Sequence, residues 1–339
     1  MEYEAFGLRI ASDLPLPELR ERRGGGTGEA DVAVRLGEPP QRWAGAVERL
    51  RTDAAGWVAE PNALLLRVPG AATFCVANGD SVTVSPARGA EADKVRLYLL
   101  GTCMAALLMQ RDVLPLHGSA VRIGDEAYVF VGRTGAGKST LARTFMREGY
   151  AMLSDDVVPI VTGPGGRPYV VPSYPQQKLW SESLSRLDMN AADYRPIFER
   201  ETKYAVPAAE RFCDEPLPLG GWIELSRGEV GEEAGPEDGA GTRAENRVGR
   251  RAERRIGARP LEGLERIRAL HRHTFRNALL APLGKVEWHF RETARLAGTT
   301  RAHELRRPAE GFSASALKDE ILNMIRRGDF HGASDVVSV

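Results

Sequence analysis

A glycine-rich segment, residues 132–140, has the composition and spacing of a phosphate-binding loop. Its letters GRTGAGKS, from Gly132 to Ser139, satisfy the pattern G-x-x-x-x-G-K-[ST] in full. The glycines let consecutive backbone N–H groups turn toward an anion, and a helix beginning near Lys138 adds the positive end of its dipole. Lys138 is expected to reach the β- and γ-phosphates of a nucleotide and Ser139 to ligate Mg²⁺. The expected nucleotide-binding residues are Gly132, Arg133, Thr134, Gly135, Ala136, Gly137, Lys138, Ser139 and Thr140.

Two adjacent carboxylates, Asp155 and Asp156, follow this loop by about one helix, within the apolar run YAMLSDDVVPIV. Successive side chains of a strand point to opposite faces, so at a strand end one carboxylate can face Mg²⁺ and the other an acceptor hydroxyl. This division suits phosphoryl transfer, in which one acid ligates the metal and the other takes the proton of the incoming alcohol. The alternative is a structural pair that caps a helix or forms a turn.

A histidine, His117, precedes the loop in the strand-like run LPLHGSAV. Because this run leads by a hairpin directly into the loop, the imidazole is in a position to orient an acidic side chain or to touch a phosphate oxygen. The alternative is a core histidine with satisfied hydrogen bonds. We include His117 with Asp155, Asp156 and Lys138 among the candidate catalytic residues.

Other motifs of nucleotide hydrolases are missing from the sequence. There is no NKxD segment for reading guanine, and GGWIEL, which contains Glu224, matches a Walker B strand poorly. A nucleotide-switch ATPase that uses water as the acceptor therefore stays an alternative to a kinase. A catalytically dead peptide-binding scaffold is disfavoured because Lys138, Ser139 and both aspartates are present.

The predicted elements divide the chain into a β-rich first part, a central α/β part and a helical last part. Four short runs, DVAVRLG, ALLLRV, TFCVAN and DSVTVS, predict strands before residue 90, and Asn78-Gly79-Asp80 predicts a hairpin turn. A buried helix is expected over 91–111, followed by the hairpin LHGSAVRI–EAYVFV, the loop, a helix ending near Gly149 and the strand at 150–161. A P-loop core has the same order of elements, namely a strand, the loop, a helix and a second strand. Helices are expected in LEGLERIRALHRHTFRNALL and FSASALKDEILNMIRR.

The segment 227–259 contains no Leu, Phe, Trp or Tyr. Acidic residues gather in its first half and arginines in its second, and such a stretch buries too little apolar surface to order itself. We predict a disordered surface insertion. The alternative is a basic arm for a nucleic acid or an acidic peptide, which the compensating acids and the lack of interleaved aromatic residues disfavour.

The amino-acid composition and net charge are typical of a soluble globular protein. The 339 residues are 42% hydrophobic and 27% charged, with a formal net charge of zero, so neither a nucleic acid nor a membrane is an expected partner. The N-terminus lacks the basic start of a signal peptide, and the apolar run 97–109 is too short to span a bilayer. The widely spaced cysteines, Cys75, Cys103 and Cys213, indicate buried thiols in a reducing cytoplasm.

Together, an HGS-type strand, a GxxGxGKS loop and a downstream SDD resemble the core of HPr kinase/phosphorylase and, more distantly, of phosphoenolpyruvate carboxykinase. The resemblance implies ATP and Mg²⁺ as cofactors. It implies that Asp155 acts as the base toward a serine, that Asp156 and Ser139 hold the metal and that His117 lies in the active site. Thr140 stands where HPr kinases usually have a glutamate, and PLPLGGWIEL does not match their E-x-R-G-x-G segment, so phosphorolysis and regulation of HPr are not expected.

The opening YEAFGLRIASDLPLPEL and the segment SYPQQKLW, residues 173–180, resemble the HPr-kinase-like enzymes encoded beside ribosomal peptide biosynthesis genes, including lasso peptide precursor kinases. These enzymes transfer phosphate to the C-terminal serine of a precursor peptide. The resemblance therefore implies a flexible peptide as partner, and a homo-oligomer is compatible with it because HPr kinases form hexamers. Candidate contacts to the peptide are Lys203, Arg211, His273 and Arg276. The alternative for each is an ordinary surface charge, since such side chains are usually exposed.

The sequence thus predicts an α/β fold with a P-loop kinase core of the HPr kinase and phosphoenolpyruvate carboxykinase type. We expect a β-rich N-terminal domain over 1–90, the kinase core over 91–226, the insertion over 227–259 and a helical part over 260–339 that completes the kinase domain. The expected function is that of a cytoplasmic, ATP- and Mg²⁺-dependent kinase of a lasso precursor. An HPr-type protein serine kinase of carbon regulation and a nucleotide-switch ATPase are the alternatives.

Overall fold

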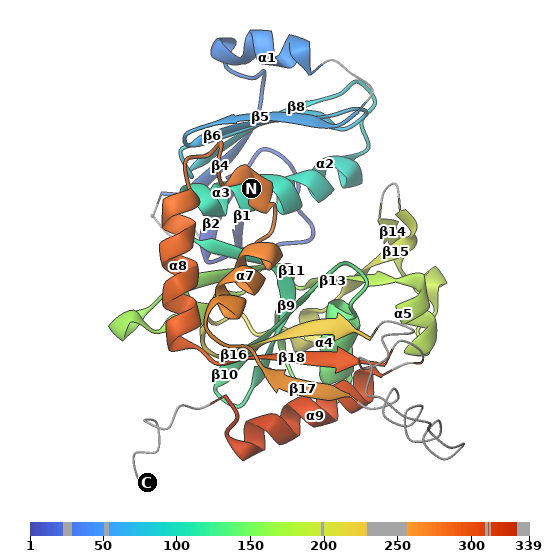
Figure 1. Ribbon diagram of the computed structural model, residues 1–339. Helices are drawn as coiled ribbons and strands as arrows, with labels where there is room; N and C mark the ends of the chain where they lie inside the picture. Colours follow the sequence, from blue (N-terminus) through green and yellow to red (C-terminus); the bar gives the residue numbers. More distant parts are fainter. Residues whose placement is uncertain are drawn as a thin grey trace, which may run out of the picture.

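The described part of the chain is a mixed α/β protein built around three sheets and several helices (Figure 1). The computed structural model describes residues 1–22, 29–50, 54–197, 200–228, 256–308, 311 and 313–330. The predicted insertion falls almost wholly outside these ranges, since residues 229–255 are not among them. The two ends of the segment 227–259 are ordered, which differs from the predicted disorder. Arg227 is the last residue of strand β16, Gly257–Arg259 belong to strand β17, and both strands pair with β18.

The first sheet has eight strands in the order β3-β1-β2-β4-β8-β7-β6-β5. Their bounds are Glu2–Ala5 (β1), Leu8–Ser12 (β2), Arg20–Glu21 (β3), Val32–Leu36 (β4), Gly56–Glu60 (β5), Ala63–Val68 (β6), Ala72–Ala77 (β7) and Ser81–Pro86 (β8). The four predicted strands are confirmed as β4, β6, β7 and β8. The predicted hairpin turn joins β7 to β8, with Asn78 and Gly79 at φ of 56° and 71°, a region that these two residue types tolerate.

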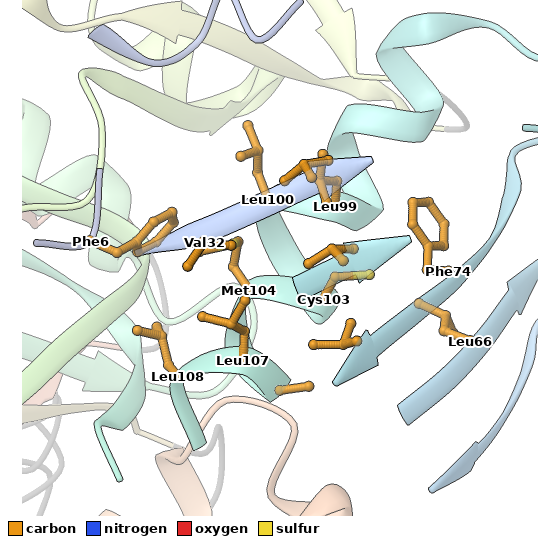
Figure 2. Close-up of a cluster of buried hydrophobic side chains, with 14 of the residues drawn as sticks. Phe6, Val32, Leu66, Phe74, Leu99, Leu100, Cys103, Met104, Leu107 and Leu108 are labelled. Carbon is orange, nitrogen blue, oxygen red and sulfur yellow. The ribbon is translucent and has the colours of Figure 1, made fainter. Parts of the chain in front are cut away.

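A helical run, predicted over 91–111, packs against this sheet. It comprises α2 (Ala92–Tyr98), a π-helical turn (Leu99–Cys103) and α3 (Met104–Gln110). Figure 2 shows its apolar side chains, among them Leu99, Cys103 and Met104, facing side chains of the first sheet such as Phe74. The same run also contacts β9, so it lies between the first sheet and the second. As predicted, the three cysteines are buried.

The second sheet positions the chemistry-bearing residues. Its seven strands run in the order β10-β9-β11-β12-β16-β18-β17, and β10 also pairs with β16, which closes a ring of five strands. Their bounds are Leu114–Ile123 (β9), Glu126–Gly132 (β10), Met152–Thr162 (β11), Pro168–Val170 (β12), Leu217–Arg227 (β16), Gly257–Pro260 (β17) and Ala302–Arg307 (β18). The predicted β9–β10 hairpin is confirmed, and β10, β16 and β18 are parallel.

Helices cover both faces of this sheet because its strands bury alternate side chains on each side. Phe130 and Ile223 pack against α4 (Lys138–Arg147) and α9 (Ala314–Arg327). Val129 and Trp222 pack on the other face against α7 (Leu264–His273) and α8 (Val286–Thr299). The predicted helices α4 and α9 are confirmed, and the helix predicted over 261–280 is confirmed only for α7, which ends at His273 and is followed by a separate 3₁₀ turn. Helix α8 has no predicted counterpart.

Smaller elements complete the described chain. A third sheet, in the order β13-β15-β14, lies beside α4 and comprises β13 (Gln176–Trp180), β14 (Arg195–Ile197) and β15 (Arg200–Pro207). Short helices are α1 (Ala44–Arg49), α5 (Ser181–Arg186) and 3₁₀ turns at Gln41–Trp43, Pro164–Gly166, Ala191–Asp193, Ala209–Arg211 and Asn277–Leu279. No helix in the described ranges combines the length and the apolar character needed to cross a membrane.

Candidate active site

The glycine-rich loop joins the end of β10 to the start of α4. Gly135 and Gly137 adopt φ of 81° and 104°, a region that favours glycine, and a Cβ atom at either position would meet nothing within 4 Å. The Lys138 ammonium donates to the carbonyl oxygens of Gly132 at 2.8 Å and Arg133 at 3.2 Å. Burial lowers the pKa of Lys138 to about 8, against the opposite influence of Asp155 and Asp156. A glycine-rich loop ahead of a ten-residue helix, with a buried lysine at the start of that helix, fits a phosphate chain.

The candidate histidine and the two aspartates meet because β9 and β11 are antiparallel neighbours. Their register places Val157 opposite His117, Asp156 opposite Gly118 and Asp155 opposite Ser119. The glycine of this HGS segment is required by close packing, since a Cβ atom on Gly118 would lie 2.6 Å from the carbonyl oxygen of Phe130.

We expect Gly118→Ala to lower the free energy of unfolding by about 1–3 kcal/mol, because backbone must move to accommodate the methyl group. The measurement is urea unfolding followed by circular dichroism. Gly298→Ala in α8 is the matched control, since a Cβ atom there meets nothing within 4 Å and helix propensity favours alanine. Equal stabilities of the two variants would contradict the packing argument.

The two adjacent carboxylates have different surroundings. Asp155 is only 2% exposed; its Oδ1 accepts a hydrogen bond from Ser119 Oγ at 2.6 Å, and its Oδ2 accepts one from the backbone N–H of Lys178 at 2.9 Å. Burial raises the pKa of Asp155, while hydrogen bonds from Ser119, Lys178 and the loop residue Ser139 oppose that rise. Asp155 therefore lies beneath the loop, on the side of the predicted metal ligand Ser139.

Asp156 faces the open side. Its backbone has φ of 73°, a left-handed conformation that costs a non-glycine residue roughly 1–2 kcal/mol. Its Oδ2 accepts a hydrogen bond from Lys178 Nζ at 2.5 Å, and its Oδ1 lies 3.6 Å from His117 Nδ1. Burial acts to raise the pKa of Asp156, but the positive charges of Lys178 and Lys203 hold it well below its ordinary value. Asp156 is therefore ionised at neutral pH.

His117 is held in one tautomer beside Asp156. Its Nδ1 lies 3.0 Å from the backbone carbonyl oxygen of Asp156, so this nitrogen must carry the proton and donate it, which leaves Nε2 as an acceptor. The ring packs against Phe275 with centroids 5.3 Å apart. Burial, aided by the charge of Lys138, lowers the pKa of His117 to about 4, so the imidazole is neutral at neutral pH.

Two cavities adjoin at the loop. The smaller, of about 240 Å³, lies over Gly137, Lys138, Ser139 and Thr140. The larger, of about 1360 Å³, extends toward α7 and the π-helical turn, where Gly101 and Thr102 line it. Both cavities are lined by His117, Thr134, Gly135, Ala136, Asp156, Lys178 and Lys203. The nine loop residues predicted to bind the nucleotide all line one cavity or both.

Three of the four predicted peptide contacts reach the larger cavity. Lys203, from β15, and His273 and Arg276, at the end of α7 and just after it, line that cavity. Arg211 does not line it; this exposed residue donates to the carbonyl oxygen of Gly149 at 3.4 Å. The structure thus brings three of these side chains to the site and leaves the fourth outside.

Further polar residues of the site had weak sequence signals. Lys178, the partner of Asp156, lies within SYPQQKLW, but the charge alone does not distinguish it from a surface lysine. Glu224 lies opposite Val131 on the adjacent parallel strand. Its Oε1 accepts a hydrogen bond from Arg272 Nη2 at 2.7 Å and lies 2.7 Å from His273 Nε2. Its environment is thus an ion-pair cluster in the wall of the larger cavity.

A Mg²⁺ ion needs few protein ligands when substrate phosphates and water supply the rest. The Ser139 hydroxyl and the neighbouring Asp155 carboxylate are oxygen donors of the kind that this ion prefers. Within the described ranges, no group of three or more His, Cys, Asp or Glu side chains could hold a metal ion by itself. Ser139 and Asp155 could therefore supply two of the ligands of a Mg²⁺ ion, with the others coming from phosphate oxygens and water.

Comparisons with known proteins give similarities to solved structures only. No protein family and no curated protein sequence matches the chain. Among solved structures, the chain is similar to the HPr(Ser) kinase/phosphatase from Coxiella burnetii, with 8% sequence identity and a TM-score of 0.32, over 63% of this chain and 92% of that one.

Proposed function

We propose that the protein is a phosphotransferase that uses ATP and Mg²⁺. The observation that carries this proposal is that one pocket is lined both by the loop residues Lys138 and Ser139 and by the ionised carboxylate of Asp156. A phosphate-binding loop positions the donor, and a carboxylate facing it can receive the proton of an acceptor hydroxyl. An enzyme that hydrolyses ATP uses a water molecule as the acceptor, so it would not need the larger cavity beside the loop and Asp156.

Within this class, we propose a serine kinase whose acceptor is the C-terminal serine of a lasso precursor peptide. The larger cavity, about 1360 Å³, exceeds the roughly 300–1,000 Å³ typical of small-molecule sites and suits several residues of an extended peptide. Lys203, Arg272 and Arg276 line it and would attract the peptide's carboxylates. The peptide class itself rests on the sequence resemblance.

The environments of the two aspartates favour roles opposite to those implied by that resemblance. We propose Asp156 as the base, because it lines both cavities beside the neutral imidazole of His117. Asp155, buried near Ser139, is then the metal-side carboxylate. The single hydrogen of the serine hydroxyl goes to Asp156, so His117 would act by holding the backbone of Asp156 through its Nδ1–H.

Bound ATP supplies the γ-phosphoryl group, with Mg²⁺ offsetting its charge. The serine oxygen bonds to the γ-phosphorus as its proton passes to Asp156, and the bond from that phosphorus to the bridging oxygen breaks to release ADP. Lys138 stabilises the negative charge that accumulates on the phosphate oxygens. Lys178 keeps Asp156 ionised before the transfer.

The test is intact-mass analysis of a lasso precursor ending in serine after incubation with the protein, ATP and Mg²⁺. A precursor with alanine in place of the terminal serine is the control. We expect a gain of one phosphate on the serine peptide alone. ATP consumption without peptide, at a rate equal to that with peptide, would instead identify an ATPase, and phosphorylation of HPr but not of the precursor would identify an HPr-type kinase.

The pH dependence of ATP affinity tests the assignment of Lys138. Its pKa is about 8, so the charged form that attracts phosphate is present below pH 8 and is lost as the pH rises. We expect the affinity for ATP to fall roughly fivefold between pH 8 and pH 9, measured by calorimetry. Lys138→Arg, whose guanidinium stays charged, should remove this dependence. A flat profile for the unmodified protein would contradict the assignment.

A further inference from the structure

An arginine at the end of β18 reaches the glycine-rich loop. Arg307 Nη2 donates to the carbonyl oxygen of Gly135 at 3.2 Å, and the side chain lines the same small pocket as Lys138 and Ser139. Its Nε is buried and has no hydrogen-bond partner within the described part of the chain. A buried guanidinium N–H without a partner is costly, which points to an acceptor that completes the site.

The side chains that line this pocket carry a net positive charge, which would attract an anionic acceptor. Among the described residues, five cationic side chains line it against two carboxylates: Lys138, Lys178, Arg186, Lys203 and Arg307 against Asp156 and Glu182. Each carboxylate already pairs with a cation of the pocket, Asp156 with Lys178 and Glu182 with Arg186. Burial lowers the pKa of Arg307, and the charges of Arg227 and Arg186 act in the same direction. A ligand with several negative charges would relieve this excess.

We propose that Arg307 contacts the phosphate chain of the bound ligand, as a second cation beside Lys138. Its planar fork of N–H groups can donate to Gly135 and to a phosphate oxygen at once, which a lysine cannot do in the same geometry. Naming that ligand as ATP rests on the proposed function, whereas the polyphosphate contact rests on the pocket alone.

The experiment measures binding of inorganic tripolyphosphate and of ATP, each with Mg²⁺, to the full chain by isothermal titration calorimetry. We expect Arg307→Gln to weaken both ligands ~10- to 100-fold, the usual effect of losing a hydrogen bond to a charged group. Arg306→Gln is the matched control, because Arg306 is exposed, points to the other face of the strand and lines neither cavity. It should change affinity by less than about twofold.

Unchanged tripolyphosphate affinity in Arg307→Gln, even with lower thermal stability, would overturn the proposal and leave Arg307 a structural residue. An equal loss in Arg306→Gln would also overturn it, since the effect would then be one of net charge. Arg307→Lys keeps the charge without the fork and should bind roughly 3- to 10-fold more weakly. If the glutamine variant does not fold, undiminished binding by Arg307→Lys overturns the proposal instead.

The outcomes separate this inference from the proposed function. Loss of tripolyphosphate binding in Arg307→Gln, with no peptide phosphorylated by the unmodified protein, would support the anion contact and reject the kinase. Phosphorylated peptide together with normal tripolyphosphate binding by Arg307→Gln would support the kinase and reject the contact.

Discussion

Asp156→Asn is expected to lower the rate of peptide phosphorylation roughly 10²- to 10⁴-fold while leaving ATP affinity nearly unchanged. The amide keeps the shape of the side chain and accepts a hydrogen bond from Lys178, but it cannot take the proton of the serine hydroxyl. The measurement is single-turnover transfer to the precursor peptide, with ATP binding followed by calorimetry. Thermal unfolding of the same sample shows whether the variant is folded at the assay temperature.

Asp155→Asn is the matched variant one residue away. Because Asp155 lies beneath the loop near Ser139, we expect this change to raise the Mg²⁺ concentration needed for half-maximal transfer. If Asp156→Asn transfers phosphate at the normal rate, and Asp155→Asn loses the rate at every Mg²⁺ concentration, Asp155 is the base and our assignment is wrong.

Lys178→Met is expected to lower the free energy of unfolding by about 3–5 kcal/mol, because it leaves the carboxylate of Asp156 buried without its cation. The side chains of Lys178 and Asp156 are 9% and 14% exposed and their charged atoms are 2.5 Å apart, so solvent screens the pair little. Asp156 raises the pKa of Lys178 against the effect of burial, which agrees with the lowered pKa of Asp156. The measurement is urea unfolding at pH 7.

The double variant Asp156→Asn/Lys178→Met completes a thermodynamic cycle. With neither charge of the pair left, it should be more stable than Lys178→Met alone. Unfolding at acid pH gives a second check: the pair stabilises the protein above the ordinary pKa of an aspartate, near 3.8, and this contribution is lost as the pH falls toward the lowered pKa of Asp156. A double variant as unstable as the sum of the single variants would show that the two side chains do not interact.

The sequence by itself determined the local elements. Strand β10, the loop and helix α4 follow from the spacing of glycines, lysine and apolar residues within about twenty positions, because the hydrogen bonds and side-chain contacts of such elements are formed by near neighbours. The same holds for the β7–β8 turn at Asn78-Gly79. Helix α8 was not predicted, and its apolar residues are not confined to the buried face, since Val286 and Phe290 are exposed.

Only the tertiary structure decided how the site is assembled. The register shifts between Met152 and Ser154, and Asp156 has a positive φ; together they set which carboxylate faces the cavities. The regular alternation of side chains along a strand does not predict either feature. Lys178 and Arg307 reach the site from β13 and from β18, so no local pattern marks them. They lie there because chain segments far apart in sequence bury their apolar faces together, which brings charged side chains close enough to pair or to share a ligand.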